Sequence, residues 1–314
     1  MSMNVFITGA SSGIGAALAR EFARRGATLG LMARRKENLE ELIATLPNPE
    51  RHHAYVCDVT DRDALIACAR EFDKVVGGTD IAIANAGISV GVKTQFYADL
   101  EVMEKVYKTN VFAMASTFHA FIEPMMERKR GTLVGIGSVA GIRGMPGTDA
   151  YCSSKSAVIT YCESLRVEMK KHGIDVLTVS PGFVKTPLTD VNPYPMPFLV
   201  TADEFAQAAV RNIMAKKTYS TVPWQMGIVS KLLRLLPNCV FDKVFGKRKQ
   251  KPRNNEINRA SCGRFGFTRK NFDYDGNGRA LLFATAHGIY NIYVNGIAVE
   301  GYFLAPGTSY YTER

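Results

Sequence analysis

Tyr151 and Lys155 are the residues whose types and spacing point most directly to chemistry. They stand four positions apart in the stretch 150–171, which contains neither Pro nor Gly and repeats apolar residues at helical spacing. On a helix, residues i and i+4 share a face, so the phenol and the ammonium would be neighbours. A nearby cation lowers the pKa of a phenol. The pair is therefore a candidate general acid and base for an alcohol or a ketone, although a core tyrosine beside a solvated lysine gives the same pattern.

A glycine-rich segment near the N-terminus is suited to hold a phosphate. The apolar run 4–7 leads into TGASSGIG at 8–15, and an amphipathic stretch, 16–25, follows. This order predicts a strand, a tight turn and a helix whose N-terminus attracts an anion. Glycine turns also join strands to helices without a ligand, so the assignment depends on the β-α-β context. Predicted cofactor contacts in this segment are Gly9, Ser11, Ser12, Gly13, Ile14 and Gly15.

The end of the next predicted strand, 28–32, distinguishes between two nicotinamide dinucleotides. A carboxylate there would accept a hydrogen bond from the ribose of NAD, whereas arginine suits the 2′-phosphate of NADP. The sequence places Arg34 and Arg35 at this point and has no acid before Glu37. It therefore favours NADP(H) over NAD(H), with a solvated basic helix start as the alternative.

Strand and helix patterns alternate over most of the chain. Further strands are predicted over 53–57, 80–84, 132–137 and 174–180, and helices over 61–76, 100–126 and 150–171. The alternation predicts an α/β fold with a doubly wound parallel sheet of Rossmann type. Ligands bind such sheets at the carboxyl ends of the strands. Predicted cofactor contacts there are Asp58, Val59, Asn85, Ala86, Gly87, Pro181, Gly182 and Val184.

In this order and at this spacing, the motifs resemble those of the short-chain dehydrogenase/reductase family over residues 1–253. The matching segments are TGASSGIG at 8–15, NAG at 85–87, Asn110, Ser138, Tyr151 with Lys155, and PGFVKT at 181–186. The resemblance implies an enzyme in which a nicotinamide cofactor carries the hydride while the protein supplies orientation and a matched proton.

The same resemblance implies a role for each site residue. Tyr151 would exchange the proton, while Lys155 would lower the pKa of Tyr151 and hold the nicotinamide ribose. Ser138 would bind the substrate oxygen, and Asn110 would support a water relay behind Lys155. Thr186 would contact the nicotinamide carboxamide.

The almost wholly apolar segment 193–200 lies where the resemblance places the substrate loop. Its side chains Tyr194, Met196, Phe198 and Leu199 would line a hydrophobic pocket, which favours a lipophilic alcohol or ketone. Two alternatives to an enzyme remain open: a non-catalytic dinucleotide-binding sensor and a carbohydrate-binding fusion protein. The four residues Asn110, Ser138, Tyr151 and Lys155 together favour the enzyme.

Positive charge is concentrated in one region. Between 231 and 270, twelve Lys and Arg residues stand against two acids, and the difference equals the formal net charge of +10 of the whole chain. The apolar cationic stretches 226–236 and 238–249 suit either a peripheral contact with an anionic membrane or a cover over the substrate mouth or subunit contact. We favour the latter, in a homodimer or homotetramer. Nucleic-acid binding is not expected, because no stacking platform or reading motif accompanies the charge.

Several other classes of protein are disfavoured. The five His residues lack metal-ligand spacing and the six Cys residues include no CxxC, so no metal site is predicted. Neither a secretory signal nor a stretch of transmembrane length is evident. With unpatterned cysteines, these features indicate a cytoplasmic protein, a membrane-associated one being the second option.

Residues 254–314 differ in character and are predicted to form a second, β-rich segment. Short β-like runs occur at 281–285 and 287–294, and Asn295-Gly296 predicts a two-residue hairpin. The segment resembles a fragment of the N-terminal β-sandwich of bacterial α-L-rhamnosidases, which suggests a fusion. It offers no carboxylate pair that could cleave a glycoside.

Overall fold

The computed structural model describes residues 3–246, 250, 251 and 253, together with the strands between residues 281 and 312 that are named below. The chain divides into two compact units, Met1–Ser261 and Cys262–Arg314. The predicted boundary after Arg253 falls beside residues outside the described part of the chain, so it stays a prediction. Within the described residues, no helix has both the length and the apolar character needed to cross a bilayer.

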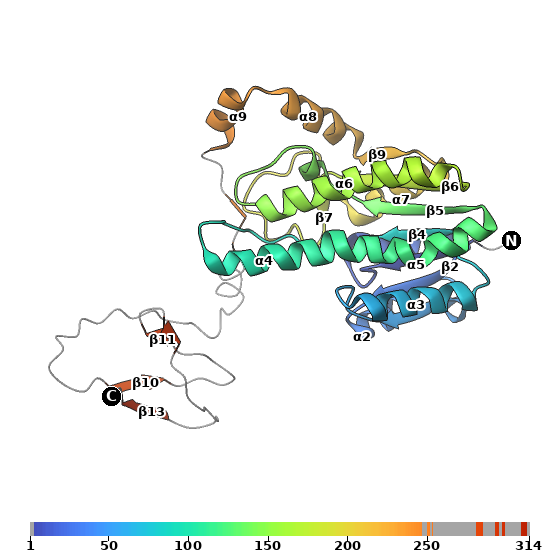
Figure 1. The fold of residues 1–314 in the computed structure, drawn as a ribbon, viewed down its shortest axis with the longest axis horizontal. Coiled ribbons are helices and arrows are strands. Elements are labelled where there is room, and N and C mark those ends of the chain that lie inside the picture. The colour runs from blue at the N-terminus through green and yellow to red at the C-terminus, as the bar shows by residue number, and fades with distance from the viewer. Residues whose placement is uncertain are drawn as a thin grey trace. The chain divides into compact units, whose positions relative to one another are not determined.

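The first unit is built on a sheet of seven parallel strands in the order β3-β2-β1-β4-β5-β6-β9 (Figure 1). Their bounds are β1 (Asn4–Thr8), β2 (Thr28–Ala33), β3 (His53–Val56), β4 (Ile81–Ala84), β5 (Gly131–Ile136), β6 (Ile174–Pro181) and β9 (Tyr219–Val222). The strand order reverses at β1 and β4, where a crevice opens at the carboxyl ends of the strands. The predicted doubly wound parallel sheet is confirmed.

Helices cover both faces of this sheet. One face carries α1 (Gly13–Arg24), α2 (Lys36–Ala44) and α7 (Ala202–Met214), and the other carries α3 (Arg62–Val75), α5 (Ala113–Arg128) and α6 (Asp149–Lys170) (Figure 1). Phe22 and Phe205 are fully buried on the first side, and Phe6, Phe72 and Phe118 on the second. Burial of each such side chain stabilises the fold by roughly 1.5–3 kcal/mol. The two helix layers therefore hold the sheet, and with it the ends of the strands, in place.

The predicted continuous helix 100–126 is wrong in one respect. The structure has α4 (Tyr97–Tyr107), then a π-helical turn, Lys108–Phe112, and only then α5. A π turn holds one residue more than an α turn, and such turns often lie at functional sites. The turn contains Asn110, which is buried.

The remaining elements of the first unit are η1 (Pro49–Arg51), η3 (Val139–Gly141), β7 (Val184–Lys185), β8 (Val200–Thr201), α8 (Trp224–Leu235) and α9 (Asn238–Phe245). Of these, η1 lies at the amino end of β2 and β3, and the others follow the carboxyl ends of the strands. The predicted helices 226–236 and 238–249 correspond to α8 and α9, and residues 247–249 lie outside the described part.

Two antiparallel strand pairs are described in the second unit. β10 (Leu281–Ala284) pairs with β13 (Ser309–Thr312), and β11 (Tyr293–Val294) pairs with β12 (Ile297–Ala298). The last pair flanks Asn295-Gly296 as a hairpin requires, although those two residues lie outside the described part. Most of the segment on which the rhamnosidase resemblance rests also lies outside it, so that resemblance remains a hypothesis.

Candidate active site

The turn between β1 and α1 has a shape that only glycine permits. Gly9 and Gly13 have φ values of +67° and +55°, in the left-handed region. A Cβ on Gly9 would lie 2.8 Å from the Cα of Ala86, and a Cβ on Gly15 would overlap the carbonyl oxygen of Gly9. The turn therefore forms a cradle of bare backbone at the N-terminus of α1, which suits an anionic phosphate.

Asn85 holds this cradle from the neighbouring strand. Its side-chain Nδ2 donates to the carbonyl oxygens of Thr8 and Gly9 at 2.9 and 3.1 Å. The backbone N–H groups of Asn85 and Ala86 donate to the Thr8 hydroxyl at 3.1 and 3.2 Å. The predicted cofactor residue Asn85 thus has a structural task as well, because it joins the end of β4 to the glycine turn.

A cavity of about 890 Å³ opens from this cradle along the carboxyl edge of the sheet. Every residue that the sequence assigned to the cofactor lines it: Gly9, Ser11, Ser12, Gly13, Ile14, Gly15, Arg34, Arg35, Asp58, Val59, Asn85, Ala86, Gly87, Tyr151, Lys155, Pro181, Gly182, Val184 and Thr186. Ser138 lines it too, whereas Asn110 lies behind the wall. An elongated cavity with a phosphate cradle at one end fits a dinucleotide.

Two exposed arginines stand beside the cradle, and β2 ends without an acid. The Nη2 of Arg35 donates to the hydroxyls of Ser11 and Ser12, both at 3.3 Å. The Nη1 of Arg34 lies 3.7 Å from the Oδ2 of Asp58. A cluster of guanidinium and hydroxyl donors at this point can bind a phosphate with charge-assisted hydrogen bonds.

Asp58 keeps its negative charge at this edge. Burial raises the pKa of its carboxyl, but hydrogen bonds from the backbone and hydroxyl of Thr60 and the charge of Arg34 outweigh burial and lower it below its ordinary value. Its Oδ1 accepts both Thr60 bonds, at 2.9 and 2.8 Å. An ionised acceptor so placed can bind an amino group.

Tyr151 lies near the start of α6 and faces Ser138 at the end of β5. Burial raises the pKa of Tyr151 to about 12, and a hydrogen bond with Ser138 opposes this shift only in part. The direction is opposite to the predicted lowering by Lys155, because burial outweighs every other influence. The phenol is therefore protonated at neutral pH. Ser138 is buried, and its Oγ accepts from the N–H of Ala140 at 3.1 Å as the N-cap of η3.

Lys155 lies one helical turn further along α6 and is 5% exposed. Its Nζ donates to the carbonyl oxygen of Ile136 at 2.8 Å and lies 5.9 Å from the centre of the Tyr151 ring. Burial lowers the pKa of Lys155 to about 8. A Cβ on Gly87 would lie 3.5 Å from this Nζ, so Gly87 leaves the ammonium accessible from the dinucleotide cavity.

Asn110 ties the loop after β4 to α6. Its Oδ1 accepts from the N–H of Ile88 at 2.8 Å, and its Nδ2 donates to the carbonyl oxygen of Ile88 and to the hydroxyl of Ser154, both at 3.0 Å. A Cβ on Gly87 would lie 3.3 Å from the Oδ1 of Asn110, close to where it would meet Lys155. The π turn thus brings the Asn110 amide close to Lys155, and the water relay that the resemblance implies stays a prediction.

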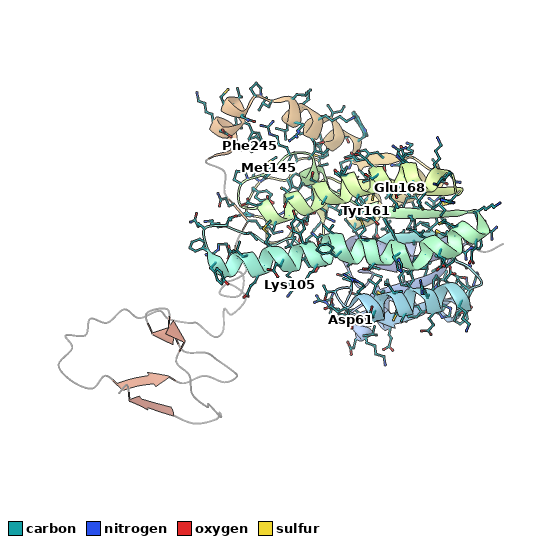
Figure 2. All side chains as sticks on the ribbon, viewed as in Figure 1. Asp61, Lys105, Met145, Tyr161, Glu168 and Phe245 are labelled. Carbon is teal, nitrogen blue, oxygen red and sulfur yellow. The ribbon has the colours of Figure 1, made fainter. Side chains whose placement is uncertain are left out.

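A second cavity, of about 350 Å³, adjoins the first. Ser138 and Tyr151 line both cavities, so the phenol lies where they meet. The walls of the second cavity are mostly apolar: Val139, Ala140, Met145, Pro146, Phe183, Leu188, Tyr194, Pro197, Met226, Val229, Leu233 and Phe245. Figure 2 labels two of these residues, Met145 before α6 and Phe245 at the end of α9. This cavity suits a small apolar ligand that presents one polar atom to Tyr151.

With this geometry in view, comparisons with known proteins identify the family. A family model described as short chain dehydrogenase matches residues 3–194. The chain belongs to the short chain dehydrogenase family. An uncharacterized oxidoreductase of Myxococcus xanthus is 38% identical over 242 residues, which cover 75% of this chain and 93% of that protein. Epidermal retinol dehydrogenase 2 of Homo sapiens is 36% identical over 241 residues, which cover 74% and 78%.

Solved structures of short chain dehydrogenases have the same fold. One from Sphingobium yanoikuyae, in complex with NADPH, gives a TM-score of 0.65 at 29% identity and covers 79% of this chain and 97% of its own. A tryptophan variant of actinorhodin polyketide ketoreductase with NADPH gives 0.64 at 26% identity, covering 70% and 95%. This family binds a nicotinamide dinucleotide. It is a family of oxidoreductases, and the chain is one of its members.

In this short chain dehydrogenase the predicted substrate loop lines the second cavity only in part. Tyr194 contributes to the wall, but Phe198 and Leu199 are exposed and Met196 is not among the lining residues. The loop end is held by the pairing of β8 with β7 directly after Leu199, and Phe198 and Leu199 precede this pair with their side chains in solvent. The prediction for these three side chains is wrong.

Most of the second cavity is built by residues that the sequence motifs did not indicate. One face of α8 supplies Met226, Val229, Ser230 and Leu233, while its opposite face leaves Trp224, Ile228, Leu232 and Leu235 exposed. Arg143 fixes the corner between α8 and α9: its Nη1 donates to the carbonyl oxygens of Leu233 and Leu236 at 2.6 and 2.7 Å. The helical cover predicted for 226–236 is the one signal that pointed here. Ser89 and Lys251 also line the cavity, and no sequence pattern marked them.

Proposed function

We propose that this chain is an NADP(H)-dependent oxidoreductase that interconverts a lipophilic ketone or aldehyde and the corresponding alcohol. One observation carries the proposal: Ser138 and Tyr151 line both the dinucleotide cavity and the apolar cavity. A group bound in the second cavity can therefore contact the phenol while it faces the first. Tyr151 is the one phenol among the described residues that line both cavities, and Gly182, Leu188 and Thr189 are shared by them as well.

The bound dinucleotide would be held by the glycine cradle, Arg34, Arg35 and Lys155, and it supplies or accepts the hydride. For reduction, Tyr151 donates its proton to the carbonyl oxygen, which Ser138 orients by a hydrogen bond. The raised pKa of Tyr151, about 12, keeps this proton in place at neutral pH. For oxidation, the phenolate must form first, so a rising pH favours that direction.

Lys155 would act on both the dinucleotide and the Tyr151 phenol. Its ammonium is within reach of the dinucleotide cavity and carries up to three donors, of which Ile136 engages one. The remaining donors can bind ribose hydroxyls. A protonated Lys155 also favours the phenolate of Tyr151, so its contribution grows as the proton leaves the phenol. We assign Asn110 to positioning, with a water relay behind Lys155 as the role to be tested.

The preference for NADP(H) is supported by charge at the end of β2. Arg34 and Arg35 stand beside Ser11 and Ser12, and the strand ends without a carboxylate. Two similar proteins, a short-chain dehydrogenase from Sphingobium yanoikuyae and a variant of actinorhodin polyketide ketoreductase, were solved with NADPH. The preference for a lipophilic substrate is supported by the apolar cavity walls and by a relative named as a retinol dehydrogenase.

The test replaces Tyr151 with Phe, which removes one hydroxyl and keeps the ring. We expect NADPH binding to change by less than about threefold while ketone reduction falls by about three orders of magnitude or more, the range for loss of a proton donor. Tyr161→Phe is the matched control, because Tyr161 lies on the same helix and packs on Phe118 outside both cavities. Near-normal turnover by Tyr151→Phe would rule out the proposed mechanism.

We further propose that the exposed apolar face of α8 is a contact between subunits in a homodimer or homotetramer. Trp224, Ile228 and Leu232 recur at helical spacing on this face, and such a stripe is normally covered. Light scattering of the wild type and of Ile228→Glu tests it: the variant should dissociate. Binding to anionic vesicles at low salt, lost in the same variant, would instead assign the face to a membrane.

A further inference from the structure

Three described residues that follow α9, namely 250, 251 and 253, pack against the first unit beside the substrate cavity, and we call them the strap. The ends of the strap are anchored on the dehydrogenase core. A Cβ on Gly147 would lie 2.8 Å from the side chain of Gln250, and Arg253 pairs with Asp99 at 2.7 Å. Between these anchors, the side chain of Lys251 enters the cavity.

Lys251 is unusual because an ammonium group is buried in an apolar cavity. It is 5% exposed, and its Nζ donates to the Ser89 hydroxyl at 3.0 Å and to the carbonyl oxygen of Leu188 at 3.1 Å. Both acceptors are neutral. Among the described residues that line the cavity there is no carboxylate. Burying a charge without a counter-charge is costly, and here burial lowers the pKa of Lys251 to about 8.

The other cation of the cavity wall has a different use. Arg143 donates to carbonyl oxygens at the end of α8 and lies 4.0 Å above the ring of Phe241, so its charge holds the corner of the cover. Lys251 has no comparable helix end to stabilise. One polar atom of the wall has no hydrogen-bond partner: Oδ1 of Asn192 is buried and accepts no hydrogen bond from the described residues.

We propose that Lys251 binds a carboxylate of the substrate, so that the ligand of this cavity is a lipophilic oxo acid or hydroxy acid. The inference rests on the proposed function and deepens it. An incoming carboxylate would supply the counter-charge that the cavity wall lacks. The free-energy cost of removing the Lys251 ammonium from water has by then already been incurred on folding. A carboxylate suits a single ammonium, whereas phosphate groups usually require a fork of donors or several cations. Asn192 would accept a donor elsewhere on the same ligand.

The experiment compares straight-chain methyl-ketone acids of increasing length with their methyl esters, using NADPH and the full chain. The measured quantity is the ratio of kcat/KM for each acid to that for its ester. In the wild type the ratio should exceed one and peak at one chain length. Lys251→Met should lower it by about tenfold or more, mainly through KM, as expected for loss of a charged hydrogen bond. Lys251→Arg should retain part of it, and exposed Lys231→Met should leave it unchanged.

A pH series adds a readout that a merely structural lysine would not give. Because the acid requires protonated Lys251, the ratio in the wild type should fall as pH rises above about 8. Tyr151, Tyr194 and Arg143 are the other titratable groups that line the cavity. Since acid and ester meet the same Tyr151, its titration cancels in the ratio. The fall should be absent in Lys251→Met.

Failure of this inference and failure of the proposed function can be told apart. If acid and ester lose activity equally in Lys251→Met, the lysine only anchors the strap and the inference is wrong, while the oxidoreductase proposal stands. If the wild type reduces neither compound, calorimetry with decanoate and decanol decides without turnover. Selective loss of decanoate binding in Lys251→Met supports the inference, and equal binding overturns it.

Discussion

The two cavities that meet at Tyr151 are built in different ways. The dinucleotide cavity is made from the carboxyl ends of β1, β2, β4, β5 and β6, with glycine backbone and a few side chains that follow each strand directly. The substrate cavity is made from the segments 139–148 and 182–197, α8, α9 and the strap, which approach from distant parts of the chain. The first site is therefore determined by the sheet, and the second by packing over it.

This contrast predicts how each half tolerates change. The glycine turn tolerates little change, because a methyl group added to one of its glycines would meet backbone atoms at the ends of the strands. A cover held by side chains can shift while the sheet stays intact. Substitutions in the first half should therefore act on cofactor binding, and substitutions in the second should act on the substrate alone. The following experiments test this separation.

Gly15→Ala should have the largest effect. The new Cβ would overlap the carbonyl oxygen of Gly9 and lie 2.6 Å from Nδ2 of Asn85, so the cradle must deform. We expect NADPH affinity to fall by about 100-fold or more, because phosphate binding depends on close backbone approach. Isothermal titration measures it. Gly144→Ala is the control, since a Cβ there has open space; an unchanged affinity in Gly15→Ala would contradict the cradle.

Replacing Arg34 and Arg35 together with Ala should remove the preference for NADPH. Loss of two charge-assisted donors is expected to weaken NADPH binding by about 10- to 100-fold, at roughly 1.5–3 kcal/mol for a bond to a charged group. Binding of NADH should change little. Direct titration with both dinucleotides provides the comparison, with exposed Lys36→Ala as the control. A preference that survives the double replacement would refute the assignment.

The charge of Lys251 should be visible in the stability of the chain. Its pKa is about 8 when folded and near 10.5 when unfolded, so between these values the unfolded chain binds more protons and stability rises with pH. Relative to Lys251→Met, the wild type should gain up to about 3 kcal/mol from pH 7 to pH 10.5. Urea unfolding at several pH values tests this difference. A difference that does not vary with pH would mean that Lys251 is not desolvated.

Arg143→Met should loosen the substrate cover and leave the dinucleotide cavity intact. The guanidinium holds the carbonyl oxygens of Leu233 and Leu236 and the Oδ1 of Asn238, so its loss should cost about 2 kcal/mol and raise KM for the ketone. NADPH affinity should not change. Kinetics and urea unfolding measure both effects. A matching loss of NADPH affinity would show that the two halves are not separate.

The smallest effect is expected from removal of residues 254–314. A chain that ends at Arg253 keeps the strap and every assigned site residue, so NADPH binding and ketone reduction should stay within about twofold of the full chain. The full chain should hydrolyse no rhamnoside, because the second segment offers no carboxylate pair. A chain that ends at Gly246 lacks the strap and is the matched comparison: its KM should rise while NADPH affinity stays. Loss of all activity in a folded 1–253 chain would show that residues after Arg253 complete the site and that the predicted domain boundary is wrong.

The same contrast explains what the sequence could predict. The positions of Asn85 and Ser138, one and two residues after their strands, were predicted correctly because parallel strands end at one edge of the sheet. Tyr151 and Lys155 were predicted from spacing on a single helix. All these inferences use the order and spacing of residues that are close together in the sequence.

The remainder depended on long-range packing. Lys251 meets Ser89 and Leu188 across a large separation in sequence, and no spacing rule connects them. The direction of the Tyr151 pKa shift was mispredicted for a related reason, since burial is set by the cover and not by the neighbouring lysine. Phe198 and Leu199 were assigned inward from the apolar character of segment 193–200 and its place in the family resemblance, but both side chains are exposed.

The π turn Lys108–Phe112 makes chain length itself a constraint at this site. An α-helix advances by about 100° for each residue, so one additional residue rotates everything beyond it by that amount unless the extra residue is absorbed. Val106 before the turn and Met114 after it are both buried, and each fixes the rotation of its own helix. Deleting Val111 would give a regular helix, yet it would turn the Asn110 amide away from Ile88 or pull one of these side chains out of the core. An insertion or deletion here would therefore rotate one helix relative to the other. The Asn110 amide near Lys155 would be the first group displaced.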